Sequence, residues 1–170
     1  DVGLYGNTLD ITVGGALDNT GGYLRATDTL TLGAASLDNT GGTVMARSAT
    51  PGVGSANLTL SGALANGGGL IYATELLGVH TAALTGAGNL SSLNRLSLSI
   101  NGDFTNDNAI SANGNAGVTA TGTLANNARI ESAGELRFKG GNIVNAAGGE
   151  IVATDTRVDA TGGTLTIVDA

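Results

Sequence analysis

The sequence predicts an all-β solenoid, in which short strands wind into coils of roughly 20 residues that stack into a rod. Three observations support this fold class. One phrase of about that length recurs along the chain, its apolar residues alternate with polar ones, and glycine, asparagine and threonine are abundant. Alternation with a period of two is typical of a strand. A unit this short cannot bury its apolar edge alone, so successive copies have to stack on one another.

The repeated phrase is clearest at residues 30–46, which read LTLGAASLDNTGGTVMA. It returns at 9–26 as LDITVGGALDNTGGYLRA, at 58–73 as LTLSGALANGGGLIYA, and more loosely at 96–112 as LSLSINGDFTNDNAISA. Each copy predicts two or three short strands. Glycine or alanine stands four residues before the asparagine, and we expect the chain to bend there because a larger side chain would clash.

An asparagine marks the same place in each copy, and the six markers are Asn19, Asn39, Asn66, Asn106, Asn126 and Asn145. Their intervals are 20, 27, 40, 20 and 19 residues, which indicates a period near 20 with one insertion and one missing marker. We interpret the column as a structural ladder, in which stacked amides hydrogen-bond from coil to coil. The alternative is an array of sugar ligands.

Two apolar columns accompany the markers and predict the interior of the rod. One stands two residues before each asparagine and the other four to six residues after it. The expected interior residues are Leu17, Leu37, Leu64, Phe104, Leu124, Ile143, Leu24, Val44, Ile71, Ile110, Ile130 and Ile151. About eight coils, stacked roughly 4.8 Å apart, would make a rod roughly 40 Å long.

Two stretches depart from the period within what we expect to be a single segment, residues 1–170, of a longer filament. Residues 47–57 contain the only proline and predict a protruding loop. Residues 74–95 predict a degenerate coil that has lost its asparagine. Loops on a rigid scaffold are frequent binding sites, so Arg47 and Pro51 are the candidate partner-binding residues. The competing interpretation is a tolerated insertion without function.

Composition excludes several classes of function. With seven Lys and Arg residues and a net charge of −7, the chain cannot line a phosphate track, so we expect no nucleic-acid partner. No apolar run is long enough to cross a membrane. His80 is the only histidine and cysteine is absent, which excludes zinc sites and Cys/His catalysis. We therefore expect no cofactor, no bound metal and no catalytic residue.

A polysaccharide-binding or polysaccharide-cleaving β-helix enzyme domain is the alternative function. Such enzymes need acids that converge on one cleft. Asp18 and Asp38 fall in one column of adjacent coils, but other residue types replace them in the remaining copies. We interpret this column as a solvent-facing one. Arg25 and Arg47, in consecutive coils, are candidates for contact with a heparin-like glycan, although the net negative charge disfavours it.

The phrases LDNTGGTVMA and LDNTGGYLRA resemble the haemagglutinin repeats of the filamentous haemagglutinin family, the long exoproteins of two-partner secretion. The resemblance covers about residues 9 to 153. It implies a right-handed parallel β-helix, secreted or held at the cell surface of a Gram-negative bacterium after export through an outer-membrane transporter. The family's secretion-domain motifs are missing here, so the resemblance implies a piece of the shaft.

The function that the resemblance implies is structural. The chain would be a non-catalytic shaft segment of a filamentous adhesin, a virulence factor in cell adhesion, or of a contact-dependent growth inhibition effector. Its partners would be a receptor or glycan on a host or neighbouring cell. The sequence leaves open which of the two kinds of exoprotein it belongs to.

Overall fold

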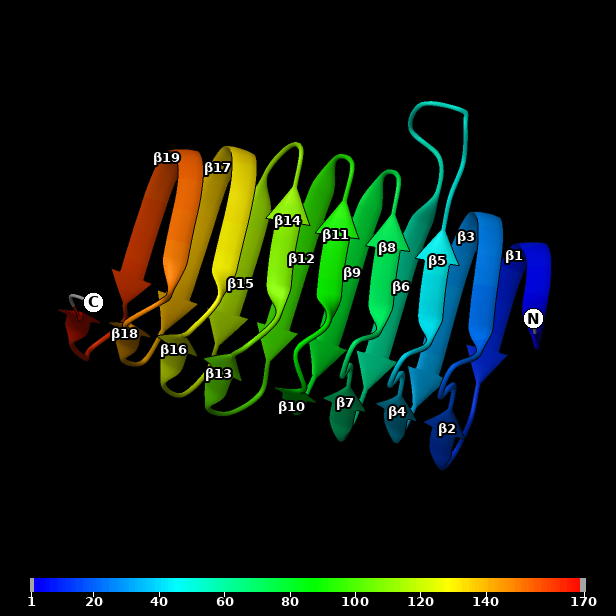
Figure 1. Cartoon of the computed structure of the whole chain (residues 1–170), viewed down its shortest axis with the longest axis horizontal. Coiled ribbons are helices and arrows are strands. Elements are labelled where there is room, and N and C mark those ends of the chain that lie inside the picture. The colour runs from blue at the N-terminus through cyan, green and yellow to red at the C-terminus, as the bar shows by residue number, and fades with distance from the viewer. Residues whose placement is uncertain (1, 169–170) are drawn as a thin grey trace.

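The computed structural model describes residues 2–168 and consists of parallel strands stacked into one rod (Figure 1). No helix occurs within these residues, and so none is long and apolar enough to cross a membrane. Eight coils follow one another along the rod, and each contributes a strand to each of three faces. The predicted all-β solenoid of stacked coils is confirmed.

The first face begins each coil and contains eight strands in one continuous parallel sheet. Four of these strands are long and bend at a corner, where a register shift in the pairing lets them continue into the second face. The long strands are β1 (Gly3–Thr12), β3 (Tyr23–Ala34), β17 (Arg129–Gly140) and β19 (Glu150–Ala160), and the short ones are β5 (Thr43–Ala46), β8 (Leu70–Ala73), β11 (Asn89–Ser92) and β14 (Ala109–Ala112).

The second face is formed by the second halves of the long strands and by four separate strands between them. These are β6 (Ser55–Leu60), β9 (Leu76–Thr81), β12 (Arg95–Ile100) and β15 (Ala116–Ala120). Its pairing also runs without interruption from β1 to β19.

The third face is made of three-residue strands and is split into two four-stranded sheets. The first sheet contains β2 (Ala16–Asp18), β4 (Ser36–Asp38), β7 (Ala63–Ala65) and β10 (Ala83–Thr85), and the second contains β13 (Phe104–Asn106), β16 (Leu124–Asn126), β18 (Ile143–Asn145) and β20 (Leu165–Ile167). No ladder pairs β10 with β13, although the two lie next to each other along the rod (Figure 1).

The core consists of inward-facing columns, in which each side chain lies in register with its equivalent one coil away. Ten of the twelve predicted interior residues are buried. Leu17 and Ile151 are only partly buried, because they lie in the outermost coils and pack against a neighbouring coil on one side within residues 2–168. The fifth coil adds Leu90, paired with Ile71 and Ile110, which the sequence reasoning missed because the asparagine marker that should precede it, at the end of the fourth coil, is absent.

The paired glycines after the asparagine have two different roles. In the turn from Asn39 to Gly42, Gly41 has a φ of +62°, and the Gly42 N–H donates to the Asn39 carbonyl at 3.0 Å. A positive φ at the third position is what a type II turn requires. Gly42 is needed for space, because a Cβ there would overlap the backbone carbonyl oxygen of Asn19 in the preceding coil. The double glycine thus allows successive turns to stack at strand spacing.

The two stretches that depart from the 20-residue period leave the stacking of the coils intact. Residues 47–54 join β5 to β6 in a loop that extends beyond the other turns (Figure 1), while residues 55–57 already belong to β6. Residues 74–95 include β9, β10 and β11, so they complete a coil, and Leu84 pairs with Leu64.

Leu64 tests the register of the third face, because its side chain is fully buried between Leu37 and Leu84. We predict that Leu64→Asp lowers the free energy of unfolding by about 3–5 kcal/mol, since an unpaired charge would be buried in the core. Ala63→Asp is the matched control: it adds the same charge to the same strand at an exposed position and should change stability by less than about 0.5 kcal/mol. Thermal unfolding followed by circular dichroism measures both. Equal melting of the two variants would contradict the register.

Candidate functional site

The six marker asparagines lie on the inside of the rod, in two sets of three joined by amide hydrogen bonds. In the first set, Asn19 Nδ2 donates to Asn39 Oδ1 at 2.7 Å, and Asn39 Nδ2 donates to Asn66 Oδ1 at 2.8 Å. In the second set, the corresponding distances are 2.8 Å from Asn106 to Asn126 and 2.9 Å from Asn126 to Asn145.

The geometry of these amides disfavours a role as sugar ligands. Asn39, Asn66, Asn106 and Asn126 are completely buried. The amide nitrogen of Asn39 also lies within hydrogen-bond distance of the Gly42 carbonyl, so both its oxygen and its nitrogen have partners inside the protein. A ligand array needs accessible donors and acceptors, which buried and mutually bonded amides do not offer.

The ladder is interrupted at the end of the fourth coil, and the third face is split between the fourth and fifth coils. The residue in the asparagine position is Gly86, with a φ of +87°. Without an amide there, the Asn66 amide nitrogen reaches, within residues 2–168, only the Asn89 carbonyl, at 3.4 Å. The Asn106 side-chain oxygen accepts the backbone N–H of Asn108.

Asn108 is a buried residue of this region that the sequence reasoning missed, although it stands two residues after a marker in the phrase TNDNA. Its Oδ1 accepts the backbone N–H of Gly88 at 3.0 Å, which ties the turn after the fourth coil to the turn after the fifth. Its Nδ2 has no hydrogen-bond partner among the described residues. The join between the two ladders is therefore less completely bonded than the ladders themselves.

The carboxylates of Asp18 and Asp38, stacked in adjacent coils, are exposed, and each forms a hydrogen bond within its own turn. Each accepts the backbone N–H of the threonine two residues later, at 2.8 and 2.9 Å. Hydrogen bonds from the side chain and backbone of Thr20 lower the pKa of Asp18 below its ordinary value. A general acid for glycoside cleavage needs the opposite shift of its pKa, so the environment of Asp18 does not favour that role.

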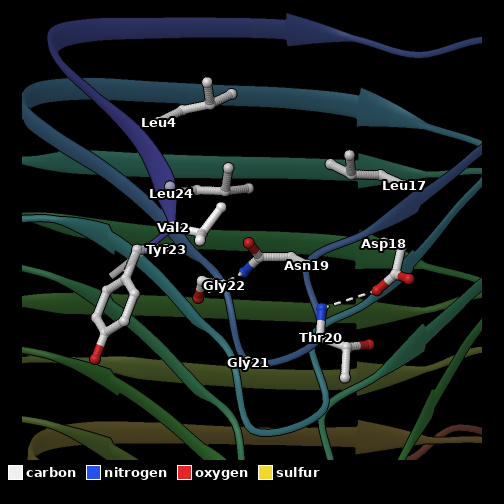
Figure 2. A pocket seen from close by; sticks show the side chains of 11 residues that line it. Val2, Leu4, Leu17, Asp18, Asn19, Thr20, Gly21, Gly22, Tyr23 and Leu24 are labelled. Atoms are coloured by element: carbon white, nitrogen blue, oxygen red, sulfur yellow. Dashed lines mark hydrogen bonds between the residues drawn. The ribbon is translucent and has the colours of Figure 1, made fainter.

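Two hollows lie at the ends of the described rod. The first, of about 540 Å³, is lined by Leu4, Leu17, Leu24 and the turn from Asn19 to Gly22 (Figure 2). The second, of about 300 Å³, includes Ile143 and Ile151 in its lining. The apolar lining continues the core columns, so both hollows are ends of the solenoid interior. Among the described residues, no three His, Asp or Glu side chains gather as a metal site would require.

The structure places the two sequence-predicted binding residues at different parts of the protruding loop. Arg47 is at the base, where its backbone N–H donates to the Ala26 carbonyl, whereas Pro51 is exposed at the turn. Thr74 holds the base of the loop: its hydroxyl donates to the Val53 carbonyl at 2.7 Å and accepts the Ser48 N–H. The loop is thus anchored at its base and open to solvent at Pro51.

The outer surface of the first face contains a group of side chains that the sequence reasoning did not assemble. We call it the Tyr–Arg face, and it consists of Tyr5, Tyr23, Arg25, Met45, Arg47 and Tyr72. One column runs through Tyr5, Arg25, Met45 and Tyr72, which pair in register in four consecutive coils. The signal was present in part, because Arg25, Met45 and Tyr72 all stand six residues after a marker asparagine.

Asn39 tests the ladder, since it is the middle amide of the first set. We predict that Asn39→Ala destabilises the protein by about 2–5 kcal/mol, because the buried side-chain oxygen of Asn66 loses its donor and the Asn19 amide keeps only its longer bonds to backbone carbonyls. Asn101→Ala, at an exposed position, is the control and should stay within about 0.5 kcal/mol of the parent. Denaturant unfolding gives both values. A loss for Asn39→Ala no larger than that of the control would show that the ladder contributes nothing to stability.

Comparison with known proteins identifies the family to which this chain is related. A family model described as haemagglutinin repeat matches it three times, over residues 6–92, 72–140 and 94–170. No curated protein and no solved structure matches it significantly. The three matches overlap and together extend over nearly the whole length, as the stacked coils do, and they confirm the resemblance seen in the repeated phrase. The chain belongs to the haemagglutinin repeat family.

Proposed function

We propose that this chain is a non-catalytic shaft segment of a large filamentous exoprotein, either an adhesin or a contact-dependent growth inhibition effector. The observation that carries the proposal is the stack of eight coils, in which two faces pair without interruption from the first coil to the last. Such a rod holds whatever it carries at a set distance. The haemagglutinin repeats support the same role, since the family is that of filamentous adhesins.

The proposal includes secretion to the cell surface of a Gram-negative bacterium through an outer-membrane partner transporter. Two properties of the chain support it. The fold needs no disulfide, because the sequence has no cysteine. Its stabilising contacts join each coil to the next, so coils can form one after another as a chain emerges. The proposed partners at the far side are a receptor or glycan on a host or neighbouring cell.

Filament length tests the shaft role. We predict that deleting this segment from the secreted protein shortens the filament by roughly 40 Å, which is eight coils at the strand spacing, and leaves secretion intact. Electron microscopy of the purified filaments measures the difference. An unchanged length, or a globular particle in place of a filament, would contradict the role as a shaft. Labelling of intact cells by antibodies against this segment tests surface location separately.

A separate proposal concerns the loop from residue 47 to 54: its residues Arg47 and Pro51 contact a binding partner. Deletion of residues 49–56 would restore the period, but it would remove the buried Ala56 of β6. The structure therefore favours deleting 48–53, which leaves two connecting residues, as between β8 and β9. We predict unchanged secondary structure, with a melting temperature within a few degrees of the parent, because the removed backbone is exposed or half-buried.

Cell attachment then distinguishes a binding loop from a spacer. A variant with residues 49–52 replaced by Gly and Ser is the matched control, because it keeps the length of the loop and changes its chemistry. If the loop binds, both variants attach less well than the parent. Undiminished attachment by both would exclude Pro51 from the contact.

A further inference from the structure

The fourth and fifth coils are joined differently on their three faces. We call the level at which β8, β9 and β10 meet β11, β12 and β13 the coil 4–5 joint. On the third face, no ladder pairs β10 with β13, whereas every other pair of neighbouring third-face strands within residues 2–168 is in register. The asparagine ladder stops at Asn66 and begins again at Asn106. The third face therefore lacks both its strand pairing and its amide ladder at this joint.

Apolar packing remains across the third face of the joint. Leu84 of β10 and Phe104 of β13 are 4% and 2% exposed and belong to the same core. Apolar contact has no preferred direction, so it tolerates changes of angle that a strand ladder resists. Asn108 adds a side-chain bond to the Gly88 N–H, but its Nδ2 is buried and has no partner among the described residues. This side of the joint is thus held by contacts that allow a tilt.

The corner between the first and second faces, opposite the third face, is well bonded at the same joint. β8 pairs with β11 at four positions, and β9 pairs with β12 at six. Glu75 of the fourth coil stands at this corner, where its backbone carbonyl accepts the Arg95 N–H at 2.9 Å. Its carboxylate accepts from Asn94 Nδ2 at 2.8 Å and lies 3.8 Å from the Arg95 guanidinium. The backbone and the side chain of Glu75 therefore both fasten the fourth coil to the fifth.

We propose that the coil 4–5 joint is a hinge, at which the rod bends by opening its third face while Glu75 keeps the opposite corner closed. The inference goes beyond the proposed function, because it concerns movement of the rod and holds for either kind of exoprotein. β9 and β12 are six residues long. At 3.3 Å per residue they extend over about 20 Å, so a bend of about 10° would open the third face by roughly 3 Å.

The direction of the bend follows from the side that is bonded. The corner at Glu75 lies on the inside of the bend, and the third face lies on the outside. The loop at residues 47–54 projects from the same corner, because it joins β5 of the first face to β6 of the second (Figure 1). Bending therefore turns the two halves of the rod toward the side from which the loop projects. The spacing of the coils along the closed corner does not change, so the shaft changes direction without becoming shorter.

Distances between pairs of nitroxide labels, measured by electron paramagnetic resonance, test the hinge. The chain has no cysteine, so two cysteine substitutions carry the labels. Asp38→Cys with Thr105→Cys crosses the joint on the third face. Asp18→Cys with Thr85→Cys and Thr105→Cys with Thr166→Cys are the matched controls, because they occupy equivalent exposed positions three coils apart but do not cross the joint.

A fourth pair, Thr27→Cys with Leu93→Cys, crosses the joint at the corner and is also three coils apart. We expect the distance distribution of the Asp38–Thr105 pair to be broader than those of both third-face controls by roughly 3 Å, as a bend of about 10° requires. The corner pair should stay as narrow as the controls. Equal circular dichroism spectra and melting temperatures establish that the labelled variants are folded.

Glu75→Ala tests what holds the corner. The distribution of the corner pair should broaden in this variant, because Asn94 and Arg95 lose their partner. Glu135→Ala is the matched control, since its carboxylate pairs with Arg137 of the same strand and not with the next coil. It should leave the corner pair unchanged.

Three outcomes would overturn the proposal. Equal widths for all four pairs would mean that the joint does not move. Equal broadening on the third face and at the corner would mean a loose joint without a closed side. A corner distribution that Glu75→Ala leaves unchanged would remove Glu75 from the hinge. Filament length, which tests the shaft role, does not depend on these widths, so the hinge can fail while the shaft role stands.

Discussion

The close stacking of identical backbone positions is the constraint on which the rest of this structure depends. Coils repeat at about the strand spacing of 4.8 Å, so each residue lies against its own equivalent above and below. Inside, this requires side chains that pack on copies of themselves, such as Leu37 on Leu64. At the turns it requires glycine, because a Cβ at Gly42 or Gly69 would overlap the carbonyl of the asparagine one coil earlier. Asparagine suits a buried column because one amide both donates and accepts.

The fourth coil shows what happens when one column changes. Gly86 cannot continue the ladder, and both the amide chain and the pairing of the third face stop at that level. The first and second faces continue unchanged, so the rod does not end there. Asn108 bridges the gap through Gly88 but leaves its own amide nitrogen unpaired among the described residues. Three faces therefore tolerate a local fault that a single sheet would not, because the remaining two keep the coils in register.

The outward columns are free of the constraint that governs the inward ones. They need only tolerate solvent and their neighbours, so they can carry chemistry without disturbing the core. In the later coils this freedom is used for exposed ion pairs, such as Arg137 with Glu135 at 2.9 Å, which add little stability. In the first four coils it is used for tyrosine and arginine. The rod thus combines a uniform interior with a surface that varies along its length.

The sequence by itself determined the strand periodicity, the coil length and most of the core, because stacking forces each column to repeat as a pattern that is visible in the chain. Leu37, Leu64 and the asparagine column were predictable for that reason. The tertiary structure alone decided what depends on register across irregular intervals. It brought Tyr5, which has no marker asparagine before it, into line with Arg25 and Tyr72, and it placed Leu90 in a column whose marker is missing. Spacing along the chain defines an inward column, whereas alignment on an outward face follows from the backbone hydrogen bonds between coils.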